Sequence, residues 1–132
     1  MTQRPPLSKG EMEVARVLWD LGRATVRQVH EAFPAERGID FATVQTYLRR
    51  LEAKGYVKGQ LEGRVRIYVP GVRPTTVIRE TVDELVDRLF GGEALPLVRH
   101  LIEDRGLQEG DLAELRRLID RLEEEGGHDE RT

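Results

Sequence analysis

The chain has 132 residues and a net charge of −3, with 39% of its residues apolar and 34% charged, a length that suits one domain or two small ones. Because it contains no Cys, disulfides, thiolate metal sites and thiol nucleophiles are excluded. No apolar run approaches the ~18 residues of a membrane span, and the N-terminal residues lack the apolar core of a signal peptide, so a soluble, cytoplasmic protein is expected.

The charges are unevenly distributed along the chain. The first 70 residues hold 12 Lys or Arg against 8 Asp or Glu, whereas the rest of the chain holds 9 against 16. A basic half of this kind can face a polyanion while the acidic half faces elsewhere. Since the chain as a whole is acidic, any contact with nucleic acid is expected to be local.

Two helices are predicted in the first 33 residues. Residues 8–11 and 25–28 have the S/T-x-x-E/Q pattern of a capping box, which opens a helix by satisfying its first backbone N–H groups. Gly22 is predicted to end the first helix and Pro34 follows the second, because neither residue favours continuation of a helix.

The third predicted helix, from an N-cap at Asp40 to Lys54, has two different faces. Its apolar residues recur at the i, i+3, i+4, i+7 spacing of one helix face. They are Val44, Tyr47, Leu48 and Leu51. The opposite face combines short side chains, an amide, a hydroxyl and guanidinium groups, with Glu52 as a single acidic residue near its edge. A merely solvated face usually mixes Glu and Lys, so this composition favours a binding surface.

A β-hairpin is predicted after the third helix. Residues 55–71 contain two short runs of period two around a turn at residues 61–63. In the second run Arg64, Arg66 and Tyr68 share one face. Three helices followed by a two-stranded wing predict a winged helix-turn-helix, whose third helix enters a major groove of DNA.

Three further helices are predicted after Pro74, ending at Gly91-Gly92, near Asp104 and at Gly126-Gly127. Helices of this size form only a marginal domain, and a second copy of the chain would cover their apolar faces. The alternative is a monomer in which they pack on the N-terminal domain. The predicted dimer interface consists of Ile78, Val82, Leu85, Leu89, Leu97, Leu101, Leu115, Leu118 and Leu122.

The candidate DNA contacts lie on the third helix and the hairpin. Small residues let a helix sink into a groove, while Gln45 suits adenine and Arg50 suits guanine. The Arg residues of the hairpin suit phosphates, although charge on an edge strand also serves to prevent aggregation. The candidate contacts are Ala42, Thr43, Gln45, Thr46, Arg49, Arg50, Lys54, Arg64 and Arg66.

The segments "LSKGEMEVARVLWDLGRATVRQVHEAF", "TVQTYLRRLEAKGYV", "GRVRIYVP" and "DRLFGG" together resemble the penicillinase-repressor family of bacterial regulators, the BlaI/MecI/CopY type. The resemblance spans about residues 7–125. It implies a winged-helix DNA-binding domain in residues 1–71 and a helical dimerisation domain in residues 72–132. It also implies a homodimer that binds a palindromic operator and represses β-lactamase or related genes.

Two regulatory features of the family can be compared with this chain. Copper-responsive members carry a C-terminal Cys cluster, and there is no Cys here. Antibiotic-responsive members are cut at an Asn-Phe bond by a membrane sensor-protease. His100-Leu101 occupies the matching position, and the chain contains no Asn. A sensor-protease partner would therefore need a different specificity.

The sequence predicts a homodimeric, sequence-specific DNA-binding transcriptional repressor that occludes a promoter. No enzymatic activity is expected, because the GxSxG, HExxH and phosphate-loop motifs are absent. No cofactor or metal is expected, because the three His residues lack ligand spacing. The alternatives are a winged-helix module that binds another protein and a repressor that senses a small molecule. The absence of an aromatic-lined pocket among the C-terminal helices counts against the second.

Overall fold

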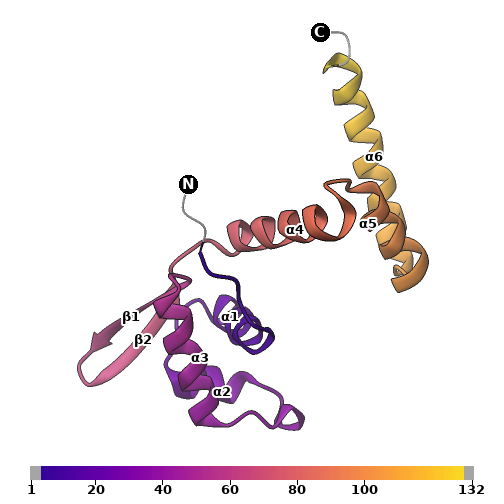
Figure 1. The fold of residues 1–132 in the computed structure, drawn as a ribbon. Coiled ribbons are helices and arrows are strands. Elements are labelled where there is room, and N and C mark those ends of the chain that lie inside the picture. Colours follow the sequence, from indigo (N-terminus) through magenta and orange to yellow (C-terminus); the bar gives the residue numbers. More distant parts are fainter. Residues whose placement is uncertain (1–3, 130–132) are drawn as a thin grey trace. The chain divides into compact units, whose positions relative to one another are not determined.

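The computed structural model describes residues 4–129, with side chains up to residue 126. The chain forms two compact units, which meet in sequence between Thr81 and Val82. The elements are α1 (Lys9–Leu21), α2 (Val26–Ala32), the 3₁₀ turn η1 (Ala35–Arg37), α3 (Phe41–Ala53), β1 (Val57–Glu62), β2 (Val65–Pro70), α4 (Pro74–Phe90), α5 (Leu95–His100), the π-helical turn η2 (Leu101–Arg105) and α6 (Glu109–Asp129) (Figure 1). The predicted fold class, mainly helical with a hairpin wing after three helices, is confirmed.

Both predicted capping boxes are present. At the start of α1, Ser8 Oγ accepts a hydrogen bond from the Glu11 N–H at 3.2 Å, and Glu11 Oε1 accepts one from the Ser8 N–H at 2.9 Å. Thr25 and Gln28 make the same pair of bonds at the start of α2. Gly22 ends α1 with a φ of 83°, a conformation that glycine adopts without strain.

The core of the first unit lies between α1, α2 and α3 and is closed by the base of the hairpin. The predicted apolar stripe of α3 packs into this core: Val44, Leu48 and Leu51 are fully buried, and its fourth member, Tyr47, is half-buried against them. Tyr68 of β2 is buried among them and exchanges backbone hydrogen bonds with Ala24 at 2.8 and 3.0 Å. This bridge joins the hairpin to the segment between α1 and α2.

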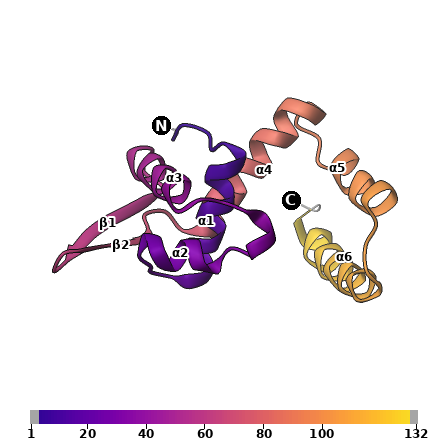
Figure 2. The ribbon, with the colours of Figure 1, turned by 90° about the horizontal axis from the view of Figure 1, so that it is seen from below.

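The hairpin is antiparallel, and its strands extend away from the three helices (Figure 2). Glu62 pairs with Val65, so the turn consists of Gly63 and Arg64 rather than residues 61–63, where we predicted it. Gly63 has a φ of 66°, as the first central position of a type II′ hairpin turn requires. The prediction was wrong because strand pairing continues through Leu61 and Glu62.

A segment before α1, residues 4–7, lies across the end of α3 and the first turns of α4; we call it the N-terminal strap. Tyr56 Oη donates a hydrogen bond to the Pro5 carbonyl at 2.7 Å. Arg4 lies over the Tyr56 ring, 5.6 Å from its centroid, and pairs with Glu80 of α4 at 2.6 Å. The strap therefore joins the segment between α3 and β1 to the part of α4 that belongs to the first unit.

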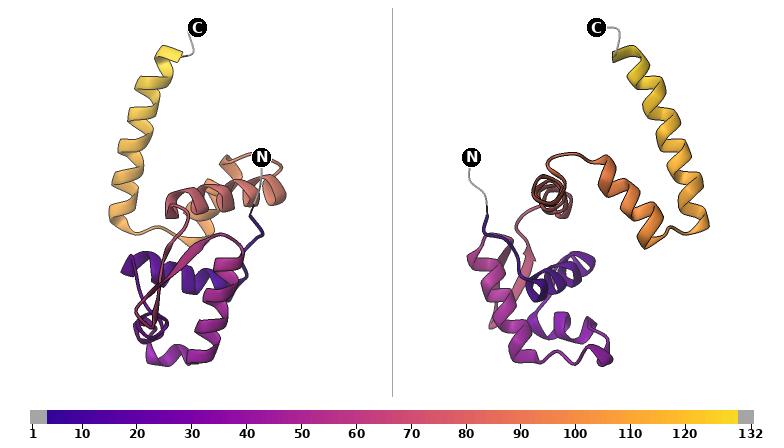
Figure 3. Two further views of the ribbon diagram at one scale, coloured as in Figure 1. Left: turned by 90° about the vertical axis from the view of Figure 1, so that its left-hand side faces the viewer. Right: turned by 45° about the vertical axis from the view of Figure 1, so that its right-hand side comes forward.

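In the second unit, α5 continues directly into η2, and a short loop joins η2 to α6 (Figure 3). The helix predicted from Ala94 to Asp104 is instead α5 followed by the π-helical turn η2. The predicted end of the last helix at Gly126-Gly127 is wrong, since α6 continues to Asp129. A glycine ends a helix by adopting a positive φ, and Gly126 does not adopt one. None of the described helices is both long and apolar enough to cross a membrane.

Candidate nucleic-acid interface

The outward face of α3 carries most of the predicted DNA contacts. Beyond the buried stripe, this face is exposed at Ala42, Thr46, Arg49 and Arg50, and half-buried at Thr43 and Gln45. Arg50 lies over the Tyr47 ring, 5.9 Å from its centroid, which holds the guanidinium near the helix surface. Within the described residues, neither Arg49 nor Arg50 forms an ion pair with a carboxylate. The face therefore presents two cations that are available to an external anion.

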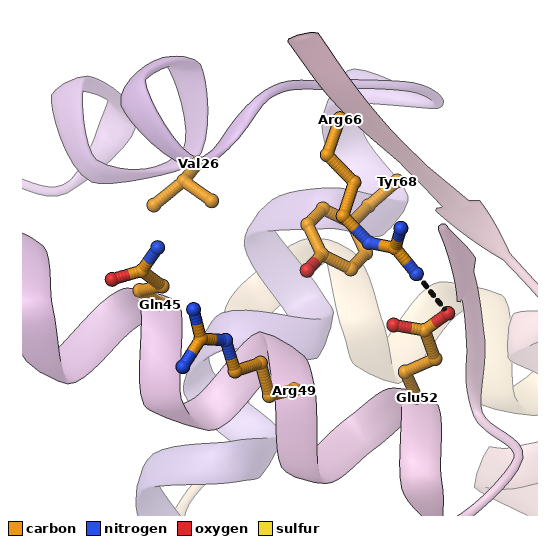
Figure 4. A pocket seen from close by; sticks show the side chains of 6 residues that line it. All are labelled: Val26, Gln45, Arg49, Glu52, Arg66 and Tyr68. Carbon is orange, nitrogen blue, oxygen red and sulfur yellow. Dashed lines mark hydrogen bonds and ion pairs between the residues drawn. The ribbon is translucent and has the colours of Figure 1, made fainter. Parts of the chain in front are cut away.

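A groove of about 340 Å³ lies beside this face, between α2, α3 and β2. Its lining residues are Val26, Gln45, Arg49, Glu52, Arg66 and Tyr68 (Figure 4). Three predicted contacts, Gln45 and Arg49 from α3 and Arg66 from β2, thus lie around one cavity. The groove is the place where α3 and the hairpin meet.

Arg66 is engaged within the protein. Its guanidinium donates to Glu52 Oε2 at 2.7 Å, and the Gly59 N–H donates to the same oxygen at 3.2 Å. The hydrogen bond to Glu52 is the largest cause that raises the pKa of Arg66 above its ordinary value. Glu52 stands out in the sequence as an isolated acid, but its spacing does not indicate a partner. An aromatic residue, Tyr68, on the same strand face as Arg66 was the only sign that this face could turn inward, and the burial of Tyr68 shows that it does.

Lys54 is also engaged within the protein. Its Nζ donates to Glu11 Oε1 at 2.6 Å and to the Pro6 carbonyl at 2.9 Å. Glu11 is only 2% exposed. Burial by itself raises the pKa of Glu11, but the hydrogen bonds from Lys54 and Ser8 outweigh it and lower that pKa below its usual value. Lys54 therefore compensates a buried carboxylate.

The wing tip carries a further cation. Arg64 is exposed in the turn, and within the described part of the chain no carboxylate pairs with it. The adjacent strand end is held by an ion pair between Glu62 and Arg23, which follows α1. Arg64 is thus exposed at the far end of the hairpin, where its guanidinium could contact a phosphate.

The predicted dimer residues form apolar surfaces that the single chain leaves uncovered. Leu89 is 65% exposed and Leu122 is 62% exposed. An apolar groove of about 330 Å³ between α5, η2 and α6 includes Leu101, Leu115 and Leu118. Of the predicted set, Ile78, Val82, Leu89, Leu101 and Leu122 are exposed, and Leu85, Leu97, Leu115 and Leu118 are half-buried.

The position that matches the family's cleavage site lies in helical backbone. His100 ends α5 and Leu101 begins η2. His100 Nδ1 lies 3.0 Å from Asp104 Oδ2 across one helical turn. A protease would have to unwind this turn before it could bind the His100-Leu101 bond in an extended conformation.

Known proteins are similar to this chain over most of its length. A family model described as penicillinase repressor matches residues 7–121. The chain is 37% identical over 108 residues to the transcriptional regulator BlaI of Mycobacterium tuberculosis, covering 81% of this chain and 75% of the relative. It is 26% identical over 120 residues to the penicillinase repressor of Bacillus licheniformis, covering 91% and 94%. The crystal structure of YusO from Bacillus subtilis, 16% identical, has a TM-score of 0.51 over 89% of this chain and 75% of that one, which indicates a similar fold.

Proposed function

Because the chain belongs to the penicillinase repressor family, we propose that it acts as a homodimer that places two copies of α3 in successive major grooves of a palindromic operator. The family consists of DNA-binding transcriptional repressors rather than enzymes. Bound there, the dimer blocks access of polymerase to the promoter. The observation that carries the proposal is the outward face of α3, where small side chains and uncompensated Arg residues lie opposite a fully buried stripe.

The residues of α3 and the hairpin have different roles in the proposed complex. Ala42 and Thr46 are small, so the helix axis can approach the base edges. Gln45, Arg49 and Arg50 reach those edges, with Gln suited to adenine and Arg to guanine. Thr43 and Arg64 contact phosphates, which fix the register without reading sequence. Lys54 and Arg66 act indirectly, because both already have partners within the chain.

The second unit supplies the dimer contact. Its helices expose large apolar side chains that a monomer would leave in water, and burial of such surface against a second copy is favourable by roughly 25 cal/mol per Å². A two-fold dimer also matches the symmetry of a palindromic site, since each α3 then reads one half-site. The dimer therefore accounts for both the apolar helix faces and the single DNA-reading unit per chain.

Selection of binding sequences from a random duplex pool tests the proposal directly. The full chain should enrich an inverted repeat whose half-sites are centred about one helical turn, or a multiple of it, apart. Sedimentation of the complex should show two chains per duplex. Enrichment of a single half-site would contradict the dimer, and the absence of binding to any duplex in dilute buffer would contradict the DNA-binding role.

Replacement of Arg50 by Ala should weaken recognition at one base position. If Arg50 reads a guanine through two hydrogen bonds, its loss costs about 1–3 kcal/mol for the selected sequence. For a duplex in which that base pair is already changed, the substitution should cost much less binding free energy. Titration of the selected duplex and its single-base variants measures the difference. Arg79→Ala, an exposed Arg of α4, serves as control, and an equal loss on every duplex would show that Arg50 does not read a base.

Replacement of Arg64 by Ala should weaken binding to all DNA sequences by the same factor. A phosphate contact contributes through release of counterions, so removing one lowers the slope of log K against log salt by about one. Binding measured at a series of salt concentrations on selected and random duplexes gives this slope. An unchanged slope would mean that the wing tip does not contact a phosphate.

A further inference from the structure

Three residues hold the wing against α3: Glu52 of α3, Gly59 of β1 and Arg66 of β2. We call them the wing clamp. We infer that Glu52 is a positioning residue for sequence discrimination: it fixes the wing against α3 and keeps Arg66 away from the phosphates. This inference rests on the proposed function, because it concerns how the same surface distinguishes one duplex from another. Glu52 itself is not required to touch DNA.

The backbone of the hairpin explains why Glu52 binds Gly59. Tyr68 is the cross-strand partner of Gly59, but its N–H and C=O both bond to Ala24 on the other side of β2. Gly59 and Tyr68 are therefore a non-hydrogen-bonded pair, and the Gly59 N–H points out from the edge of the hairpin. Glu52 Oε2 accepts this N–H at 3.2 Å. The clamp thus satisfies an edge donor that the sheet leaves unpaired.

The absence of a side chain at residue 59 lets Arg66 reach the same carboxylate. A Cβ at Gly59 would lie 2.6 Å from Arg66 Nε, closer than real Cβ contacts allow. Arg66 instead occupies this space. Its Cζ lies 5.7 Å from the centroid of the Tyr68 ring, and its guanidinium donates a hydrogen bond to Glu52 (Figure 4). One carboxylate oxygen therefore holds both strands of the wing.

The clamp has an electrostatic consequence for a bound duplex. Glu52 is the one acidic residue among those lining the groove between α3 and β2, and it neutralises a cation that would otherwise face the backbone of the DNA. Sequence-independent affinity grows with each phosphate that is neutralised. By holding Arg66, Glu52 removes a phosphate contact that carries no sequence information. On a random duplex the chain could shift its register to make that contact in full, whereas on the selected duplex the base contacts of Gln45 and Arg50 fix the register, so Glu52 lowers the affinity for random duplex more. The ratio of specific to non-specific binding therefore rises.

Glu52→Gln in the full chain separates these effects, because the amide oxygen can still accept the Gly59 N–H while the ion pair with Arg66 is lost. We expect binding to random duplex to tighten by roughly tenfold near 0.1 M salt and the salt slope to steepen by about one. Affinity for the selected duplex should gain less, so the specificity ratio falls. Arg66→Ala alone should leave the slope unchanged, and Glu52→Gln/Arg66→Ala should return it to the parental value.

Glu62→Gln is the matched control, because it removes a carboxylate from the same hairpin outside the clamp. A steeper slope in Glu52→Gln but not in Glu62→Gln supports the inference. Two results would overturn it: a slope that falls by about one in Arg66→Ala, which would make Arg66 a phosphate contact, or a specificity ratio that is the same in Glu52→Gln and the parent.

Amide hydrogen exchange at Gly59 tests the clamp without DNA, so it stays informative even if no duplex binds. Exchange of the Gly59 N–H should accelerate by roughly tenfold in Glu52→Ala and stay slow in Glu52→Gln, because only the first loses the acceptor. Equal exchange in all three proteins would show that Glu52 does not hold the wing. Failure of all duplexes to bind would instead count against the repressor function.

Discussion

Replacement of Lys54 by Met should destabilise the first unit by about 3 kcal/mol, the lower end of the range for breaking a buried ion pair. Methionine preserves the length of the stem but removes the charge that compensates Glu11. Glu11 is 2% exposed and would keep only its bonds to Ser8. Urea unfolding at neutral pH measures the loss. Lys58→Met, at an exposed position in β1, is the control and should change stability by less than about 0.5 kcal/mol.

The pH dependence of the same variant distinguishes this cause from lost packing. In the parent, the pKa of Glu11 lies below its usual 4.5, so the ion pair contributes above that pH and its contribution is lost as the pH falls through the lowered pKa. In Lys54→Met the lowering effect of Lys54 is lost while burial remains, so the pKa of Glu11 is higher than in the parent and the variant loses less stability as the pH falls. The difference between the two proteins should shrink below pH 4.5. A constant difference would show that the stem, not the charge, is responsible.

Replacement of Leu122 by Asp should convert the proposed dimer into monomers and weaken operator binding by roughly a hundredfold or more, because linked binding of two half-sites is lost. Leu122 is 62% exposed in the single chain, so a carboxylate there should leave the fold of the chain intact. Across a dimer interface it would be buried without a partner. Sedimentation velocity gives the assembly state, and titration with the full operator gives the affinity.

A single half-site distinguishes lost dimerisation from lost DNA contact. Its affinity should be the same for Leu122→Asp and the parent, because α3 and the wing are unchanged. Arg116→Asp, an exposed position on the same helix outside the predicted interface, should remain dimeric. A dimer that persists in Leu122→Asp would place the interface elsewhere.

Local signals in the sequence were sufficient for the helices of the first unit. The capping boxes at Ser8 and Thr25 were predicted and are present, because each depends on residues only three positions apart. The apolar stripe of α3 was likewise predicted from spacing alone. In the second unit the π-helical turn was not predicted, because its difference from α-helix is one of hydrogen-bond register that leaves no mark in the apolar pattern.

The ion-pair partners of Arg66 and Lys54 could not be predicted from local sequence patterns. Arg66 bonds to a residue 14 positions away and Lys54 to one 43 positions away, so both pairs depend on tertiary packing. The basic pattern predicted DNA contacts at both residues, whereas the structure gives both an internal carboxylate. Period two placed Arg66 and Tyr68 on one face but did not say which face turns inward. The burial of Tyr68 decides it.

The N-terminal strap limits how the DNA-reading unit can be shortened. A fragment that starts at Leu7 would lack the Pro5 carbonyl, and the hydroxyl of Tyr56, a residue only 8% exposed, would have no acceptor there. Removal of Arg4 would also leave Glu80 without its partner. Affinity tags and fusion partners are therefore better attached after the last helix than spliced close to residue 4.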